Sequence, residues 1–185
     1  MASIANRFVI GDSIPFACAF GSIVDNVKNV GIPGNTTDQM WGRIDADVLS
    51  KSPTAVLIWG GINDIVQSYQ ISPLKLLLMA QATEASPVNA EALVGTILPI
   101  NHFESSYPYA NLAAVNTRID EWNGSIRGMC TDYGFTLVDF AAAFRDESGN
   151  IRTDLYKSDG IHPNAAGRQV ILDVANEPFL SAVPN

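Results

Sequence analysis

A serine that directly follows an apolar run is the first residue of the chain with chemistry to offer. Ser13 lies in residues 11–14, GDSI, after the β-prone run FVI at 8–10. A serine hydroxyl is a weak nucleophile near neutral pH and needs a neighbouring base that takes its proton. A serine in this position can also do no more than cap a helix, so the motif indicates catalysis only together with partners elsewhere.

The candidate bases are the two histidines of the chain. His162 lies in residues 159–163, DGIHP, where Asp159 is close enough in sequence to accept a hydrogen bond from the imidazole ring. Such a carboxylate fixes the ring tautomer and stabilises the imidazolium that forms when a serine loses its proton. The alternative is a polar turn with a helix-capping aspartate. His102 has Glu104 as its only close carboxylate, so we expect it in a surface or substrate-binding loop instead.

Two further motifs supply hydrogen-bond donors for the negative charge that builds on oxygen during attack on a carbonyl. Gly34, in residues 29–37 (NVGIPGNTT), can present its backbone N–H without a side chain in the way. Asn63, in residues 60–64 (GGIND), can present its carboxamide, and the N–H of Ser13 would be a third donor. A turn glycine and a turn asparagine are the ordinary alternatives.

The elements that must position these groups follow from the apolar patterns. Continuous β-prone runs predict strands at 8–10, 25–30, 55–59, 92–100 and 135–140. Helical patterns predict helices at 16–23, from 37 onward, at 65–82 with a break at Pro73, at 111–131 and at 164–175. Alternating strands and helices predict an α/β fold with a parallel sheet between helix layers. Since Ser13, Gly34 and Asn63 each follow a strand, we expect them at one edge of that sheet.

Composition and charge indicate the domain organisation and exclude some classes of partner. The 185 residues, 47% of them hydrophobic, are enough for one sizeable core, and we expect a single domain over 1–185. The net charge of -8 and the lack of a basic run argue against nucleic acid as a partner. No apolar run approaches the roughly 18 residues of a membrane span. We therefore expect a soluble chain without an export signal, either cytoplasmic or a trimmed secreted domain.

No residue pattern calls for a cofactor. Phosphate-binding glycine motifs of the P-loop or dinucleotide type are missing, and two isolated histidines do not make a zinc site. Cys18 and Cys130 are far apart and read as buried thiols, not as a disulfide or metal pair. We expect Asp64 to bond loop backbone and to hold Asn63 in place, not to bind a metal. Neither a cofactor nor a metal is thus expected.

Taken together, the four motifs resemble the conserved blocks of the SGNH hydrolases, also called the GDSL esterase/lipase family, in order and in spacing. The resemblance implies that Ser13, Gly34, Asn63 and His162 are the residues that name the family, with Asp159 as the triad carboxylate. It also implies a flavodoxin-like three-layer α/β/α sandwich with a five-stranded parallel sheet. Ile14 stands where the family's shorter name has leucine.

We therefore expect a serine esterase that hydrolyses carboxylic esters of small molecules through an acyl-enzyme. Short motif loops, with 100–109 as the only extended candidate for a lid, favour short-chain acyl or acetyl esters, acetylated carbohydrate among them. Lysophospholipase and thioesterase activities are alternatives within the family. A non-catalytic carbohydrate-binding module on the same fold is a rival of another class. A second rival is a flavodoxin-type protein that binds a nucleotide or a flavin, but the sequence contains no convincing phosphate-binding loop.

Overall fold

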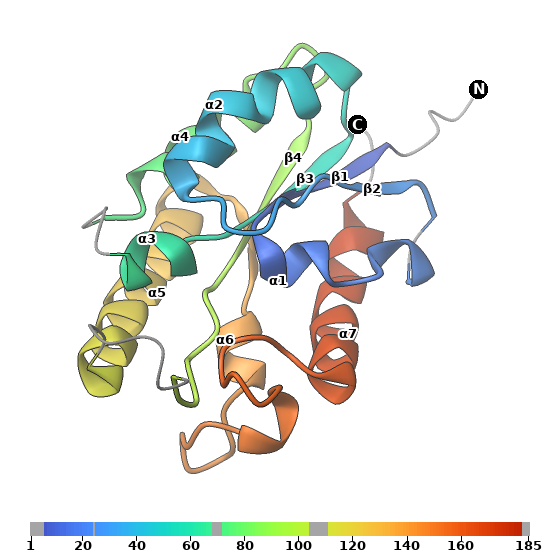
Figure 1. Ribbon diagram of the computed structural model, residues 1–185. Coiled ribbons are helices and arrows are strands. Elements are labelled where there is room, and N and C mark those ends of the chain that lie inside the picture. Colours follow the sequence, from blue (N-terminus) through green and yellow to red (C-terminus); the bar gives the residue numbers. More distant parts are fainter. Residues whose placement is uncertain (1–5, 24, 68–71, 104–110, 183–185) are drawn as a thin grey trace.

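The computed structural model describes residues 6–23, 25–67, 72–103 and 111–182 (Figure 1). Part of the expected lid, residues 104–109 with Glu104, lies outside the described residues. The stretch 68–71 of the expected helical region also lies outside them.

One parallel sheet forms the centre of the fold, in the strand order β2-β1-β3-β4-β5. Its strands are β1 (Arg7–Gly11), β2 (Val27–Asn29), β3 (Ala55–Trp59), β4 (Glu91–Gly95) and β5 (Thr136–Val138). Every residue of β3 is buried, because helices cover both faces of the sheet. The predicted α/β class with five parallel strands is confirmed, and the strand order is the flavodoxin-like one.

Two helix layers flank the sheet. The helices are α1 (Ser13–Phe16), α2 (Thr37–Asp47), α3 (Ile62–Val66), α4 (Leu74–Glu84), α5 (Leu112–Tyr133), α6 (Phe140–Ala143) and α7 (Ala165–Ser181), with short 3-10 turns at Phe20–Ser22, Leu49–Lys51 and Thr153–Leu155. In Figure 1, α2, α4 and α5 lie on one side of the sheet and α1 and α7 on the other. Within the described residues, no helix is both long and apolar enough to cross a membrane.

Side-chain caps start the longer helices where the sequence predicts them. Thr36 and Gln39 form a capping box at the beginning of α2, in which each side chain bonds the backbone N–H of the other residue. The side chain of Asn111 accepts from the first turn of α5, and that of Asn164 accepts from Gly167 in α7. These helices therefore begin within a residue of their predicted positions.

The predicted helix at 16–23 is wrong. The helix α1 ends at Phe16 after one turn, and its N-cap is Asp12, whose side chain accepts from the N–H of Ile14. The side chain of Asn29 donates to the carbonyl oxygens of Pro15 (2.7 Å) and Cys18 (3.1 Å). A side chain from β2 thus satisfies the carbonyl groups at this point, and the chain leaves the helical path after one turn.

The strand predicted at 92–100 ends at Gly95 in the structure. Beyond it, two asparagines of α5 replace a neighbouring strand: Asn123 bonds both the N–H and the carbonyl of Ile97, at 2.7 and 2.8 Å. Asn116 does the same for Ile100, with both distances 2.8 Å. The apolar character of this segment comes from burial under α5 and not from strand pairing.

Two other boundaries differ from the sequence expectation for local reasons. The predicted helical region 65–82 consists of two helices, α3 and α4, and Pro73 is the N-cap of α4. The strand predicted at 135–140 stops at Val138, because the Asp139 side chain caps α6 by accepting from Ala142.

Candidate active site

Ser13 is the first residue of α1 and follows the end of β1 by two residues. Gly11 at the end of β1 is in register with Trp59 at the end of the central strand β3, so the serine stands at the carboxyl edge of the sheet. This edge is where the strand order reverses between β1 and β3, the usual place of a ligand crevice in such sheets. The N–H of a first helical residue has no partner within its own helix, which leaves the Ser13 N–H free to bind a ligand.

The structure brings Ser13, His162 and Asp159 into one chain of hydrogen bonds. Ser13 Oγ lies 2.9 Å from His162 Nε2, although the two residues are 149 positions apart. On the other side of the ring, His162 Nδ1 lies 2.9 Å from Asp159 Oδ2. With the proton on Nδ1 held by the carboxylate, Nε2 accepts the hydrogen bond of the serine hydroxyl.

Asp159 is held in its charged form by the turn that it belongs to. Burial by itself would raise the pKa of this carboxyl, but the N–H groups of His162 and Ile161 and the His162 ring lower it below its ordinary value. Asp159 Oδ1 accepts from both N–H groups, at 2.8 and 2.9 Å. The carboxylate that orients His162 is therefore ionised over a wide pH range.

His102 lies against the turn that carries Asp159 and His162, which the sequence did not predict. Its Nε2 contacts the carbonyl oxygen of Ser158 at 2.5 Å, and the neighbouring Asn101 N–H donates to the carbonyl of Gly160 at 2.9 Å. Gly160 has a φ of +70°, and a methyl group there would lie 2.5 Å from His102 Nδ1. The loop after β4 thus packs on this turn, while Ser13 Oγ bonds His162 and not His102.

Gly34 and Asn63 belong to two segments that a hydrogen bond joins. Asn63 Nδ2 donates to the carbonyl of Asn35 at 2.9 Å, which joins the start of α3 to the loop of Gly34. An amide nitrogen carries a second N–H, so one donor remains for a ligand. Gly34 is exposed with a φ of +82°, and a methyl group there would meet no atom within 4 Å. Its backbone conformation, and not lack of space, is what favours glycine.

Asp64 bonds backbone, as the sequence predicts. Its carboxylate is fully buried and accepts from the Thr37 N–H, at 2.9 Å to the nearer oxygen, and from the Thr37 hydroxyl at 2.7 Å. Burial raises the pKa of Asp64, and the Thr37 hydrogen bonds partly offset that effect. The contact fixes the start of α2 to α3 and so holds Asn63 beside the Gly34 loop.

A second buried carboxylate, Asp12, lies directly before the serine, and the sequence assigned it no role. Its exposure is 1%, and burial raises its pKa to about 7. The N–H of Ile14 lowers this pKa and the charge of Asp64 raises it. The position in the GDSI motif was visible in the sequence, but burial depends on how α2 and α3 cover the end of β1.

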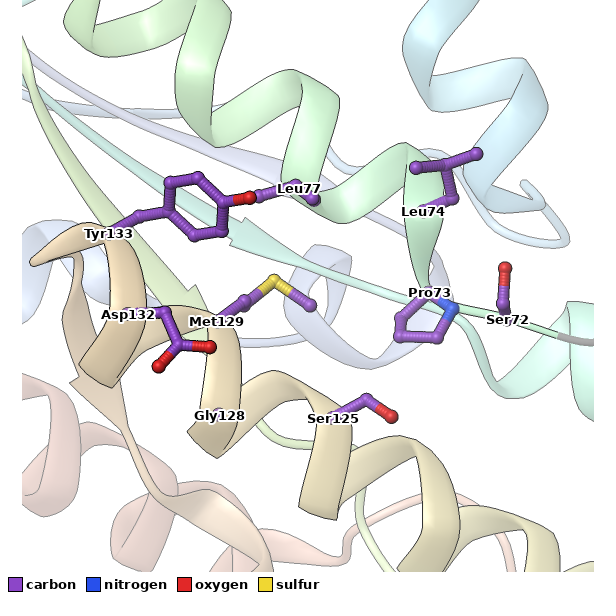
Figure 2. A pocket seen from close by; sticks show the side chains of 9 residues that line it. All are labelled: Ser72, Pro73, Leu74, Leu77, Ser125, Gly128, Met129, Asp132 and Tyr133. Carbon is purple, nitrogen blue, oxygen red and sulfur yellow. The ribbon is translucent and has the colours of Figure 1, made fainter.

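Two hollows differ in their relation to this site. A small one, of about 10 Å³, is lined by residues on both sides of Ser13, Asp12 and Ile14, and by apolar groups that include Ile62. A larger one, of about 400 Å³, lies between α4 and α5, where Leu77, Met129 and Tyr133 line it (Figure 2). Neither lining contains a predicted site residue, but only the small hollow borders residues next to Ser13. Across the described part of the chain, no three His, Cys, Asp or Glu side chains are grouped as a metal site would require.

Comparison with protein families gives a match over most of the chain. Residues 9–170 match the model of the GDSL-like lipase/acylhydrolase family, and this range contains every predicted site residue. The chain belongs to this family. An acetylxylan esterase of Geobacillus stearothermophilus is 28% identical over 151 residues, which cover 78% of this chain and 68% of the relative. Membership in this acylhydrolase family supports ester hydrolysis as the general activity.

Solved structures of other GDSL proteins have the same fold. A GDSL-like lipase of Bacteroides thetaiotaomicron superposes with a TM-score of 0.80 over 96% of this chain and 89% of its own, at 19% identity. A catalytic mutant of an acetylxylan esterase from Geobacillus stearothermophilus gives 0.73 over 97% and 95%, at 18% identity. The three-layer α/β/α architecture predicted from the motifs is thereby confirmed.

Proposed function

We propose that this protein is a serine esterase that removes short-chain acyl or acetyl groups, acetylated carbohydrates being its natural class of substrate. The observation that carries the proposal is the chain of hydrogen bonds from Asp159 through His162 to Ser13, with 2.9 Å at each step. Its sequence of carboxylate, imidazole and hydroxyl is that of the serine hydrolase triad.

The reaction proceeds in two halves. Ser13 Oγ attacks the ester carbonyl carbon while its proton moves to His162 Nε2, and the carbonyl oxygen becomes an oxyanion. The N–H groups of Ser13 and Gly34 and the carboxamide of Asn63 are the donors that stabilise this oxyanion. Collapse expels the alcohol, which takes the proton from His162 and leaves an acyl-enzyme. Water then attacks the acyl group with His162 again as the base, and the free acid leaves.

We favour small acyl groups because the hollow whose lining includes both sequence neighbours of Ser13 has no room for a long acyl chain. The hollow bordered by Asp12, Ile14 and Ile62 has about 10 Å³, roughly the size of one water molecule. The relative that is 28% identical is named an acetylxylan esterase, and acetyl is a short acyl group.

Two measurements on the purified protein test the proposal. A fluorophosphonate should label the wild type at Ser13 and fail to label Ser13→Ala, because the reagent reacts with an activated serine. Hydrolysis of p-nitrophenyl esters should be fastest for acetate and fall as the acyl chain lengthens, and acetylated xylo-oligosaccharides should release acetate. A protein that is not labelled and hydrolyses no ester would be a binding module on the same fold. A preference for long acyl chains would contradict the substrate class alone.

A further inference from the structure

We propose that Arg43 is a positioning residue that sets the distance between the serine and the oxyanion donors, an inference that rests on the proposed function. Arg43 lies in α2 and does not belong to any of the four sequence motifs. Its side chain is only 15% exposed. It nevertheless reaches both the end of β1, which precedes Ser13, and the loop of Gly34.

The guanidinium donates four hydrogen bonds. Its Nε donates to Asn35 Oδ1 at 2.8 Å, and Nη2 donates to the carbonyl of Gly11 at 3.1 Å. Nη1 donates to the carbonyl of Val30 at 2.7 Å and to Asp47 Oδ2 at 2.9 Å. Three of these acceptors therefore belong to the segments around the site, and only Asp47 belongs to the same helix as Arg43.

The acceptors identify what the side chain connects. Gly11 ends β1 two residues before Ser13, and its carbonyl also accepts from the N–H of Ile32 at 3.0 Å. Asn35 follows Gly34 directly, and its carbonyl is the acceptor of the Asn63 carboxamide. One planar group thus ties the base of the nucleophile turn to the loop that presents Gly34 and whose Asn35 carbonyl holds the Asn63 carboxamide.

Backbone bonds from Ile32 to Gly11 and from Asn35 to Ile32 also hold this loop, but none of them holds the Asn35 side chain beside Gly34 as Arg43 does. Gly34 is exposed, and a side chain there would meet open space, so packing does not hold the residue in place. Oxyanion donors act at about 2.7–3.1 Å from the oxygen that becomes charged, and a displacement of about 1 Å can cost on the order of 10²-fold in rate. Loss of Arg43 should therefore appear in kcat, with little change in KM.

The test compares Arg43→Lys with two controls. Lysine keeps the charge but cannot reproduce the fixed fork of guanidinium donors, so we expect kcat on short esters to fall about 10-fold to 100-fold with KM within about threefold. Asp47→Asn removes only the partner on the same helix and should leave kcat within about twofold. Arg127→Met removes a bidentate pair with Asp139, at 2.9 Å for both bonds, and should lower Tm without the loss of kcat.

Asn35→Ala keeps the inference testable if Arg43→Lys does not fold. It removes only the side-chain acceptor of Arg43 and keeps the backbone carbonyl that Asn63 bonds, and it should lower kcat by about 3-fold to 30-fold. Fluorophosphonate labelling of Ser13 should slow in parallel in both variants. Equal kcat in Asn35→Ala, Arg43→Lys and wild type, or a kcat loss as large in Arg127→Met, would overturn the role of Arg43. A wild type that is neither labelled nor active would instead overturn the proposed function itself.

Discussion

The serine side and the histidine side of the candidate site are held in different ways. Ser13 follows β1, which pairs with the central strand, and the carboxylates beneath it, Asp12 and Asp64, are 1% and 0% exposed. The side chains of Asp159 and His162 are 31% and 35% exposed and come from a turn between β5 and α7. The sheet therefore fixes the nucleophile, whereas contacts between loops fix the base.

The loop contacts of the histidine side form a connected bracket, residues 97–102. Its inner end is bonded by Asn123 and Asn116 of α5, as described above. Its outer end bonds the carbonyls of Ser158 and Gly160, and the hydroxyl of Tyr156 donates to the carbonyl of Pro99. Residues 97–102, which do not belong to a strand, thus link α5 to the turn that carries His162. The two sides should accordingly respond differently to substitution.

Removal of the base should have the largest effect. His162→Ala should lower kcat on p-nitrophenyl acetate about 10⁴-fold, because no other group takes the serine proton. Its Tm should change little, since the ring is half-buried on a loop. The matched control replaces the other histidine of the chain: in His102→Ala, kcat should fall by less than about tenfold. A larger loss in His102→Ala than in His162→Ala would reverse the assignment of the base.

An oxyanion donor on the serine side comes next. Asn63→Ala should lower kcat on the order of 10²-fold to 10³-fold, because the carboxamide bonds the oxyanion more strongly than the ground-state carbonyl. KM and Tm should stay near the wild-type values, as Asp64 still anchors the start of α3. Steady-state kinetics on acetate esters measure this, and an unchanged kcat would remove Asn63 from the mechanism.

A substitution that strains the contact with the bracket tests whether the bracket positions the histidine side, and it changes no reacting group. Gly160→Ala places a methyl group 2.5 Å from His102 at a φ of +70°, and should lower kcat about tenfold by moving Asp159 and His162. Gly149→Ala is the matched control, since Gly149 has a φ of +83° but open space around its added methyl group. Both should lose about 1 kcal/mol of stability from the positive φ, and Gly160→Ala should lose more because its methyl group also meets the His102 backbone carbonyl at 2.5 Å. Equal kcat values for the two variants would show that the bracket does not position the base.

The buried carboxylate of Asp12, on the serine side, should make the stability of the protein depend on pH. The pKa of Asp12 is about 7 when folded and 3.8 when unfolded, so between these values the folded protein keeps a proton that the unfolded chain releases. Its contribution to stability is full below pH 4 and is lost as the pH rises toward 7. Asp12→Asn keeps the acceptor for Ile14 and cannot ionise.

The measurement for Asp12 is urea unfolding of wild type and Asp12→Asn from pH 4 to pH 8. As the pH rises, the free energy of unfolding of the variant should increase relative to that of the wild type. The increase is about 1.4 kcal/mol for each pH unit between the two pKa values of Asp12, a few kcal/mol in total. Lowered pKa values at Asp159 and Asp139 act in both proteins and cancel in the difference. Parallel curves would contradict a buried, protonated Asp12.

Sequence patterns predicted the elements whose causes are local. The apolar run of β3 and the caps at Thr36, Asn111 and Asn164 act within a few residues, and each element begins near its predicted start, although α7 continues to Ser181, beyond its predicted end at 175. The failures at 16–23 and 92–100 have distant causes. Side chains of Asn29 and Asn123 reach those backbones from another strand and another helix.

For the site, the sequence by itself determined which residue types follow which strands, and parallel strands bring such residues to one edge. Tertiary structure alone decided that Ser13 and His162, 149 positions apart, meet at 2.9 Å. It also decided that Asp12 is buried and that Arg43 joins Gly11 to Asn35. Burial and long side-chain contacts depend on how whole layers pack, and no short segment of sequence records that packing.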